Sequence, residues 1–462
     1  MILIKGGYKM TMSHTKDMTK GSYIKVIILF ALPLFFSSLF QQLYNSIDAV
    51  IVGKFLGTNP LAAVSSSGNL IFLFISFFVG SASGIGVLIS KYFGEQNYES
   101  MKKAIHTGIA FGLVCSVLLT IIGITLAPVM LKLMKTDPEV LPESIKYFQF
   151  YFAGATGMIM YNIFNGILNA LGNSKRSLYY LIFSSLLNIV LDLLFIGVFK
   201  MGVDGAAIAT AISQIISAIL CLIFLLKKGT IYQVKIKEIK FDKQMLLLIF
   251  KYGIPAGIQN SVIALANVFV QSNINSFGKI AMAGCGTYSK LEGFAFMPVN
   301  CFCMALTTFV GQNLGAKQYE RAKKGSRFGI ICSIILSEII GILMIVLMPV
   351  LASLFSDDPE VIKITTLQSR CICGFYFLLS FSHCIAAVCR GAGKAFVPMI
   401  IMLVIWCVLR VSYIQIAMSI SHDIKLIFFA YPITWLISSI IYLIYYLFTD
   451  WVHGFEKKQN NI

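Results

Sequence analysis

The sequence predicts an all-α membrane protein that crosses the bilayer twelve times, with its helices in two groups of six. Of its 462 residues, 58% are hydrophobic and only 12% are charged, whereas about a quarter of the residues in soluble domains are charged. Many apolar runs reach the roughly 20 residues that a helix needs to cross a bilayer. The second half of the chain also repeats the first at a fixed spacing. Together these features exclude an ordinary soluble enzyme.

Apolar runs between polar breaks define the predicted helices in chain order. Each run is longer than a typical core helix, and each break contains Gly, Pro, Asn or charged residues that favour a loop. The predicted spans are 24–53, 61–90, 104–134, 145–171, 177–199, 205–226, 246–276, 281–312, 326–355, 361–389, 397–420 and 425–449.

The distribution of Lys and Arg predicts the orientation. With a cytoplasmic N-terminus, the cytoplasmic loops and tails carry 25 of these residues, the external loops carry 8, and 4 fall deeper within spans. This excess is the positive-inside pattern, so we expect the tails 1–23 and 450–462 and the linker 227–245 to be cytoplasmic, in a protein of the cell (inner) membrane. The net charge of +17 then reflects topology, and we expect no nucleic-acid partner. The linker lysines can also contact anionic lipid; they are Lys227, Lys228, Lys235, Lys237, Lys240 and Lys243.

The N-terminal segment and the cysteines exclude two further classes. Residues 1–23 lack the layout of a signal peptide. The 11 cysteines show no CxxC spacing and fall mostly in apolar runs, so a secreted disulfide scaffold is excluded. We expect Cys301, Cys303, Cys371 and Cys373 to be small apolar helix residues and not metal ligands.

A tandem duplication divides the chain. An offset of 221 residues carries Gly94, Tyr98, Glu99, Lys102, Lys103 and Gly108 onto Gly315, Tyr319, Glu320, Lys323, Lys324 and Gly329. The same offset carries Pro128–Val129, Asp137–Val140 and Gly172 onto Pro349–Val350, Asp358–Val361 and Gly393. The predicted domains are therefore an N-lobe at 24–226 and a C-lobe at 246–449, joined by the linker. Six spans per half is an even number, so we expect an axis along the membrane normal with a substrate path between the halves.

Two of the four acidic residues within spans are predicted to meet in the first lobe. A carboxylate inside the bilayer is costly, so each one requires an explanation. Span 1 and span 5 both run outward, which places Asp48 about one turn and Asp192 within about two turns of the outer surface. Asn188 lies on the same helix face as Asp192, and Thr210 on span 6 lies at a matching depth. This set can share a proton or bind a hard cation such as Na⁺ through its oxygens; alternatively, the two acids only cap neighbouring polar groups.

The remaining ionisable residues within spans have weaker interpretations. Glu292 is predicted to contact Arg370, Arg410 or a cationic substrate, because Lys290 is two residues away and faces elsewhere. Glu338 is expected to face a polar gap within its lobe, and His383 to be a satisfied interior histidine. Pro33 predicts a bend or a hinge in span 1. Gly80 and Gly84 fit close helix packing.

These segments together resemble the MATE family of multidrug and toxic compound extrusion transporters. The resemblance rests on Pro33 with Gln41–Asp48, on Asn188–Asp192, on Gly202–Thr210, and on the segments that begin at Gly94 and Gly315. It covers residues 20–449 and implies two six-helix lobes that form a V around a central cavity, with cation-coupled export of organic, often cationic and aromatic, compounds.

The resemblance also implies particular site residues. The first-lobe cation site would comprise Asp48, Asn188, Asp192 and Thr210, with a backbone carbonyl of Ala206. Residues expected near a substrate cavity are Gln41, Asn45, Asn267 and Glu292. Spans 246–276 and 361–389 contain no acidic residue, which resembles the DinF-like branch and leaves a second-lobe cation site open.

Two other functions remain as alternatives at this point. A lipid-linked oligosaccharide flippase would have the same spans with a larger and more cationic cavity. An intramembrane enzyme is more remote, since the HExxH, GxSxG, Walker and GxGxxG patterns do not occur. We expect a monomer that needs no cofactor beyond its coupling ion, H⁺ or Na⁺, and that acts on small organic substrates.

Overall fold

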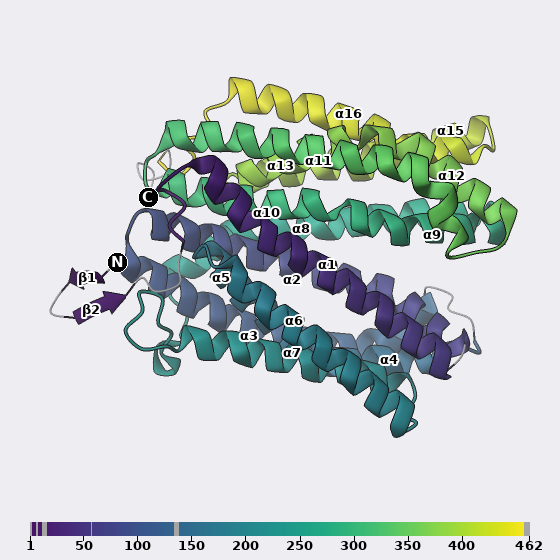
Figure 1. Ribbon diagram of the computed structural model, residues 1–462, viewed down its shortest axis with the longest axis horizontal. Coiled ribbons are helices and arrows are strands. Elements are labelled where there is room, and N and C mark those ends of the chain that lie inside the picture. The colour runs from purple at the N-terminus through teal and green to yellow at the C-terminus, as the bar shows by residue number, and fades with distance from the viewer. Residues whose placement is uncertain (1, 6–7, 12–15, 57, 134–137, 457–462) are drawn as a thin grey trace. The chain divides into compact units, whose positions relative to one another are not determined.

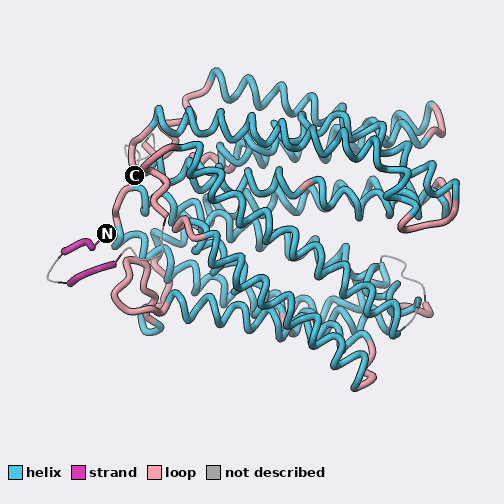
Figure 2. Tube along the Cα trace, viewed as in Figure 1, coloured by secondary structure: helices cyan, strands magenta, loops and turns pink. Residues whose placement is uncertain are grey.

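The computed structural model describes residues 2–5, 8–11, 16–56, 58–133 and 138–456. Figure 2 shows that helices make up most of the described chain. A short antiparallel hairpin of β1 (Ile2–Lys5) and β2 (Tyr8–Thr11) precedes them, with Ile2 paired to Thr11. The all-α prediction did not include this hairpin.

The first half of the chain contains seven α-helices in the described residues, labelled in Figure 1 from the purple end of the colour bar. They are α1 (Tyr23–Leu56), α2 (Thr58–Gly94), α3 (Tyr98–Leu133), α4 (Leu141–Ala153), α5 (Ala155–Ala170), α6 (Ser174–Asp192) and α7 (Val203–Leu225). A π-helical segment, η1 (Leu193–Val198), continues α6.

The linker contains one short turn of 3₁₀-helix, η2 (Ile236–Glu238), and the second half follows it. Its α-helices are α8 (Lys243–Asn275), α9 (Lys279–Ala295), α10 (Met297–Gly315), α11 (Tyr319–Ser353), α12 (Pro359–Ile372), α13 (Tyr376–Gly391), α14 (Phe396–Met402), α15 (Arg410–Ile420) and α16 (Ile424–Phe448). The turn η3 (Cys373–Phe375) joins α12 to α13, and the π-helical η4 (Leu403–Leu409) joins α14 to α15.

Each predicted span corresponds to one helix or one broken helix. Among the described residues, 10 helices are long and apolar enough to cross a membrane, or 11 when the bent pair α9–α10 counts as one span. The remaining predicted span, 145–171, corresponds to α4 and α5, which Gly154 separates into helices of 13 and 16 residues. Neither helix alone reaches the length of a span. The prediction of an all-helical polytopic membrane protein is confirmed.

Breaks within the spans fall where the local sequence disfavours a straight helix. The 41° bend between α9 and α10 lies just before Pro298, whose ring cannot follow a regular helical turn without losing a backbone hydrogen bond. Pro33 and Pro255 lie inside α1 and α8, which continue through them.

The duplication is also visible in the backbone. Gln96 and Lys317, one offset of 221 apart, both have a φ of 56°. Gly172 and Gly393 have φ values of 78° and 75°. Left-handed backbone is rare for residues other than glycine, so its recurrence at the same offset means that the loops, as well as the helices, were copied. Asp137 of the sequence repeat lies outside the described residues.

The contacts divide the chain into two compact units. Unit 1 holds Leu32–Gly257 with the residues before Met18, and unit 2 holds Met18–Ala31 with Ile258–Ile462. Of the three internal boundaries, the one at Met18 precedes α1, and the other two fall inside a helix, two residues from Pro33 in α1 and from Pro255 in α8. The predicted division at the linker stays a prediction.

Within unit 1, two glycine pairs bring α2 and α8 into backbone contact. A Cβ atom on Gly84 would lie 2.3 Å from the Cα of Gly253, and one on Gly80 would lie 2.4 Å from the carbonyl oxygen of Ala256. From the other helix, a Cβ on Gly257 would lie 2.6 Å from the carbonyl oxygen of Phe77. Small residues at a spacing of four permit such approach in membranes. The close packing predicted for Gly80 and Gly84 is confirmed, and their partners are Gly253 and Gly257.

Unit 2 is built around α10, α11, α13 and α16. In unit 2, α13 contacts α10, α11 and α16, and Figure 1 shows α13 between its neighbours α11 and α16 and the rest of the unit. Its largest fully buried side chains include Phe309, Tyr376, Trp435 and Arg410. An arginine in this set shows that the interior contains a charged region as well as an apolar one.

Candidate functional site

The predicted first-lobe residues on α6 and α7 lie together. Asp192, the last residue of α6, is fully buried, and Asn188 is buried one turn before it. Asn188 donates a hydrogen bond from Nδ2 to Oγ1 of Thr210 on α7, at 3.4 Å. Ala206 is buried one turn before Thr210 on the same helix. Packing of α6 on α7 therefore places this amide, carboxylate and hydroxyl in one region.

Asp48 reaches the same region from α1. It is half-buried, and its carboxyl group and that of Asp192 interact electrostatically. The depth argument predicted this approach of two acids from different helices. Their role as a coupling site stays a prediction.

The oxygens of this cluster are short of hydrogen-bond donors. In the described part of the chain, no donor reaches the buried Oδ1 of Asp48, the Oδ1 of Asn188, either carboxylate oxygen of Asp192, or the Oε1 of Gln214. Buried polar atoms are normally satisfied, and an exception indicates a bound ion, a water or a proton. Converging oxygens are the donor set that a proton or a hard cation such as Na⁺ requires. No group of three His, Cys, Asp or Glu residues that could hold a metal occurs among the described residues.

Three tyrosines and a glutamine complete the surroundings, and the sequence prediction did not include them. Tyr44, Tyr147 and Tyr151 all interact electrostatically with Asp48, and Tyr44 also interacts with Gln214. The rings of Tyr147 and Tyr151, one turn apart on α4, have centroids 6.0 Å apart. A spacing of four residues could have revealed two of them, because Tyr44 precedes Asp48, and Gln214 follows Thr210, by one helical turn.

A small pocket adjoins the cluster. Its lining residues are Tyr151, Gly154, Met158, Thr210, Ala211 and Gln214, and its empty volume is about 180 Å³, including its open mouth. Drug-sized ligands occupy pockets of roughly 300–1,000 Å³. The pocket therefore suits an ion, a few waters or part of a ligand, and not a whole organic compound.

The other predicted site residues are more scattered. Pro33 is buried within α1, whereas Gln41, Asn45 and Asn267 are exposed on α1 and α8. Their parts in a hinge or a substrate cavity stay predictions. Glu292 interacts electrostatically with Arg410, one of its three predicted partners.

Glu338 and His383 differ in whether their polar atoms form hydrogen bonds. Glu338 accepts a hydrogen bond from the backbone N–H of Phe377 at 3.0 Å, at the start of α13; the polar gap expected for it stays a prediction. His383 lies 5.3 Å from the ring of Trp406. However, no described residue forms a hydrogen bond with its Nε2. The expectation of a satisfied interior histidine was wrong for this atom, and the indole N–H of the neighbouring Trp406 is donated to Ser438 Oγ instead.

The four cysteines predicted to be small interior residues lie in unit 2. Cys301, Cys303, Cys371 and Cys373 are free and buried. Their burial is typical of cysteine as a small interior residue, and Cys373 also accepts a hydrogen bond from Ser369 at 3.3 Å.

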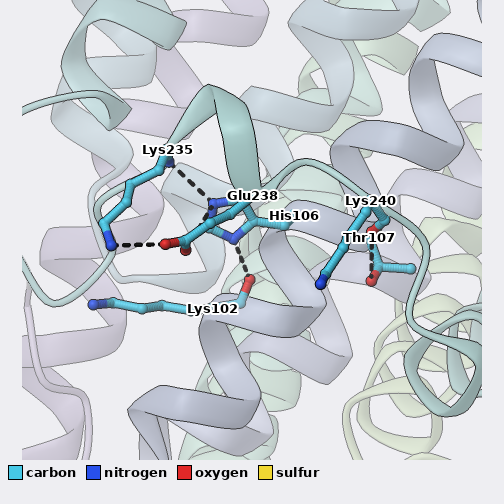
Figure 3. Close-up of polar contacts among 6 residues, drawn as sticks. All are labelled: Lys102, His106, Thr107, Lys235, Glu238 and Lys240. Carbon is cyan, nitrogen blue, oxygen red and sulfur yellow. Dashed lines mark hydrogen bonds and ion pairs between the residues drawn. The ribbon is translucent and has the colours of Figure 1, made fainter.

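The basic linker is held against α3 (Figure 3). The backbone N–H of Lys235 donates to Nε2 of His106 at 3.0 Å, so the ring proton is on Nδ1, which donates to the carbonyl of Lys102 at 2.7 Å. Thr107 accepts from the N–H of Asp242 at 3.2 Å. Lys235 also forms an ion pair with Glu238 at 2.7 Å. The linker thus has a defined path along unit 1.

Comparison with known proteins identifies the family. The sequence model of the MatE family matches residues 33–194 and 255–414, once in each half of the chain. The chain belongs to the MatE family. The MatE assignment confirms the resemblance drawn from the sequence, while membership of the DinF-like branch stays a prediction.

Curated relatives agree with the assignment to MatE. The "Probable multidrug resistance protein YoeA" of Bacillus subtilis is 30% identical over 457 residues, which cover 96% of this chain and 97% of that protein. The "Multidrug export protein MepA" of Staphylococcus aureus is 25% identical over 391 residues, which cover 81% and 84%.

Solved structures share the MatE fold. A MOP superfamily transporter from Pyrococcus furiosus has a TM-score of 0.88 at 21% identity and covers 93% of this chain and 96% of that one. The outward-facing conformation of a multidrug resistance MATE family transporter has a TM-score of 0.87 at 21% identity, over 94% and 97%. The family match and the curated relatives, with the helices long enough to cross a membrane, make this MatE protein a multi-pass membrane transporter and not an enzyme.

Proposed function

We propose that this protein exports small organic compounds, often cationic and aromatic, in exchange for a cation that binds at Asp48 and Asp192. Family membership and the names of the relatives support a multidrug exporter. One observation carries the choice of coupling site. Asp48, Asn188 and Asp192 present buried oxygens that have no donor among the described residues.

Two nearby carboxylates in a poorly solvated region repel each other when both are ionised. A shared proton removes that repulsion, and so does a bound Na⁺. We favour the proton, because one proton between Asp48 and Asp192 requires no further ligand. Na⁺ is the alternative, and it would also use Asn188, Thr210 and the carbonyl of Ala206.

Binding of a cation by Asp48 and Asp192 would alter α1, because Asp48 lies on that helix. Neutralising a charge near the outer end of this helix permits a rearrangement about Pro33, and that change would alter the affinity for substrate. Export depends on the difference in substrate affinity between the two states, and not on tight binding in either one. The proposed transport cycle therefore needs Asp48 or Asp192 to ionise in one state only.

The test is uphill efflux of a dye from proteoliposomes under a proton gradient or a sodium gradient imposed separately. Asp192→Asn should fold and still bind substrate but lose uphill export, and Asp48→Asn should behave alike. The double variant should be little worse than either single one, because the two residues act as a unit. Export by Asp192→Asn at the wild-type rate against a gradient would exclude this coupling site.

A matched control lies on α7. Asp204 pairs with Lys146 at 2.9 Å, so Asp204→Asn removes a carboxylate that already has a charged partner and should retain coupling. Thr210→Val identifies the ion, since loss of a hydroxyl ligand harms a sodium site more than a carboxylate that binds a proton. In the same vesicles, movement of labelled lipid without dye efflux would indicate the flippase alternative.

We further propose that the protein is a monomer in the cell membrane with both termini and the linker on the cytoplasmic side. The excess of Lys and Arg in the predicted cytoplasmic segments supports this orientation. The linker would tether the two halves and contact anionic lipid, without selecting substrates. Reversing the charge of three of its lysines should alter expression or lipid dependence and leave the range of exported compounds unchanged.

A further inference from the structure

A second carboxylate cluster lies in unit 2, around the half-buried Glu292 on α9 and two buried tyrosines. Tyr288, one turn earlier, donates from its hydroxyl to Glu292 Oε1 at 3.1 Å, and Tyr376 on α13 donates to the same oxygen at 3.3 Å. The hydroxyls of Tyr288 and Tyr376 are themselves 2.9 Å apart. Three oxygens from two elements therefore form a triangle in which every side is a hydrogen bond.

This triangle is short of one hydrogen when Glu292 is ionised. Its three contacts each need a donor, but each phenol supplies one hydrogen and a carboxylate supplies none. The Cys373 thiol, 3.5 Å from the Tyr288 hydroxyl, adds one contact and one hydrogen, so the shortage is unchanged. A proton on Glu292 Oε1 supplies the missing donor and allows all the contacts to form together.

The charged and titratable neighbours of Glu292 come from several elements. They are Tyr288 on its own helix, Cys373 and Tyr376 between α12 and α13, Arg410 on α15 and Tyr431 on α16. The only full charge in this set is that of Arg410, which favours an ionised Glu292.

Arg410, however, is held by other groups. It is fully buried, and its guanidinium carbon lies 4.8 Å from the ring centroid of Trp406 and 4.6 Å from that of Tyr431. Its Nε and Nη2 donate to Thr434 Oγ1 at 3.1 and 2.7 Å. Arg410 is thus a fixed positive charge that stabilises the carboxylate after its proton leaves, without replacing the proton in the triangle.

We propose that Glu292, held by Tyr288 and Tyr376, binds and releases one proton in unit 2, independently of the Asp48–Asp192 pair. Two arrangements of the same groups exchange. In one, Glu292 carries the proton and completes the triangle; in the other, it is ionised and its charge is balanced by Arg410. The proposed export function is needed only for the use of this proton in transport, and not for its binding.

The test is infrared spectroscopy with isotope-labelled glutamate, which distinguishes the carboxyl band of glutamate from that of aspartate. Infrared difference spectra of the purified protein, recorded as the pH is changed, report the C=O stretch of protonated carboxyl groups. With ¹³C-labelled glutamate, the band of a protonated Glu shifts and those of Asp48 and Asp192 do not. Exposed glutamates are ionised above about pH 6, so the comparison is made above that pH. There we expect a glutamate-sensitive band that disappears as pH rises further, is lost in Glu292→Gln, and is retained in Asp192→Asn.

Glu338→Gln is the matched control, since Glu338 is the other glutamate deep in a span of unit 2 and accepts only from a backbone N–H; it should retain the band. Tyr376→Phe keeps the carboxyl but removes one of its partners, so it should move the band to higher frequency even if Glu292→Gln folds poorly. A wild-type protein without a glutamate-sensitive band, or a band that survives Glu292→Gln, would overturn the proposal. The infrared experiment does not measure transport. A negative infrared result therefore leaves the efflux test of Asp192→Asn valid, and a negative efflux result leaves the infrared test of Glu292 valid.

Discussion

Replacing Gly84 by alanine should destabilise unit 1, because this glycine faces backbone and not a flexible side chain. The added Cβ would lie 2.3 Å from both the Cα and the nitrogen of Gly253, and 2.6 Å from the carbonyl carbon of Tyr252. The optimal separation of two non-bonded carbons is about 3.5–4.0 Å. Relief therefore requires α2 and α8 to move apart along a helix contact.

Two opposing effects set the magnitude. Alanine is better than glycine in a helix interior by about 1 kcal/mol. Overpacking a tight contact costs about 1–3 kcal/mol, and a clash with backbone belongs at the upper end of that range. Gly84→Ala should then lose about 2 kcal/mol of stability. Gly86→Ala, on the same helix, meets only the carbonyl oxygen of Gly166 at 3.5 Å and should gain about 1 kcal/mol.

The difference between the two variants, about 3 kcal/mol, corresponds to more than a hundredfold in the folding equilibrium. The measurement is the temperature at which the purified protein loses its monodisperse peak after heating in detergent. Gly86→Ala should match or exceed the wild type, and Gly84→Ala should fall well below it. Equal midpoints for the two variants would refute the close packing of α2 on α8.

Three further predictions concern the orientation, the linker and the segment before α1. In a Cys-depleted background, an impermeant maleimide outside the cell should label Asp358→Cys and not Lys237→Cys; the reverse pattern would overturn the orientation. The Lys235 ammonium holds the pKa of Glu238 below its usual range, so their contact should order the linker at neutral pH and be lost as pH falls below about 4. A spin label on the linker should become more mobile at that pH, and at every pH in Glu238→Gln; a wild-type signal that does not change with pH would count against the contact. Arg321 donates to three backbone carbonyls before α1, so Arg321→Ala should speed amide exchange there by about tenfold or more, and unchanged exchange would show that these bonds do not hold the segment.

Hydrophobic length located the helices, but it could not locate their breaks. The predicted span 24–53 corresponds to α1, Tyr23–Leu56, because a long apolar run has few alternatives in a membrane. The span 281–312 is instead two helices that meet at a 41° bend. Pro298 marks that bend, whereas Pro33 lies inside a helix that continues. A proline alone therefore does not determine whether the neighbouring turns compensate for its missing hydrogen bond.

The site was predictable where helical geometry sufficed. Asn188 and Asp192 share a helix face by spacing alone, and the direction of each span gave the depth of Asp48 and Thr210. Tyr147 and Tyr151 could not be found in this way, since a tyrosine in a span is an ordinary residue until a carboxylate is known to lie beside it. Their helix, α4, also ends at Gly154 partway along the predicted span, which obscures its depth.

The duplication explains why neither acid cluster could be inferred from the other. The offset preserves residues that determine the backbone, such as Gly172 and Gly393, which both have left-handed φ. It does not preserve the charges: the positions 221 residues after Asp48 and Asp192 are Phe269 and Tyr413. In the opposite direction, Glu292 and Arg410 correspond to Ile71 and Ile189. A glycine in a left-handed turn has no substitute without strain, whereas a buried charge in a membrane is costly and persists only where a partner or a task retains it. The two halves can therefore keep one fold while each acquires its own buried acids, and the chemistry of each half has to be read from its own contacts.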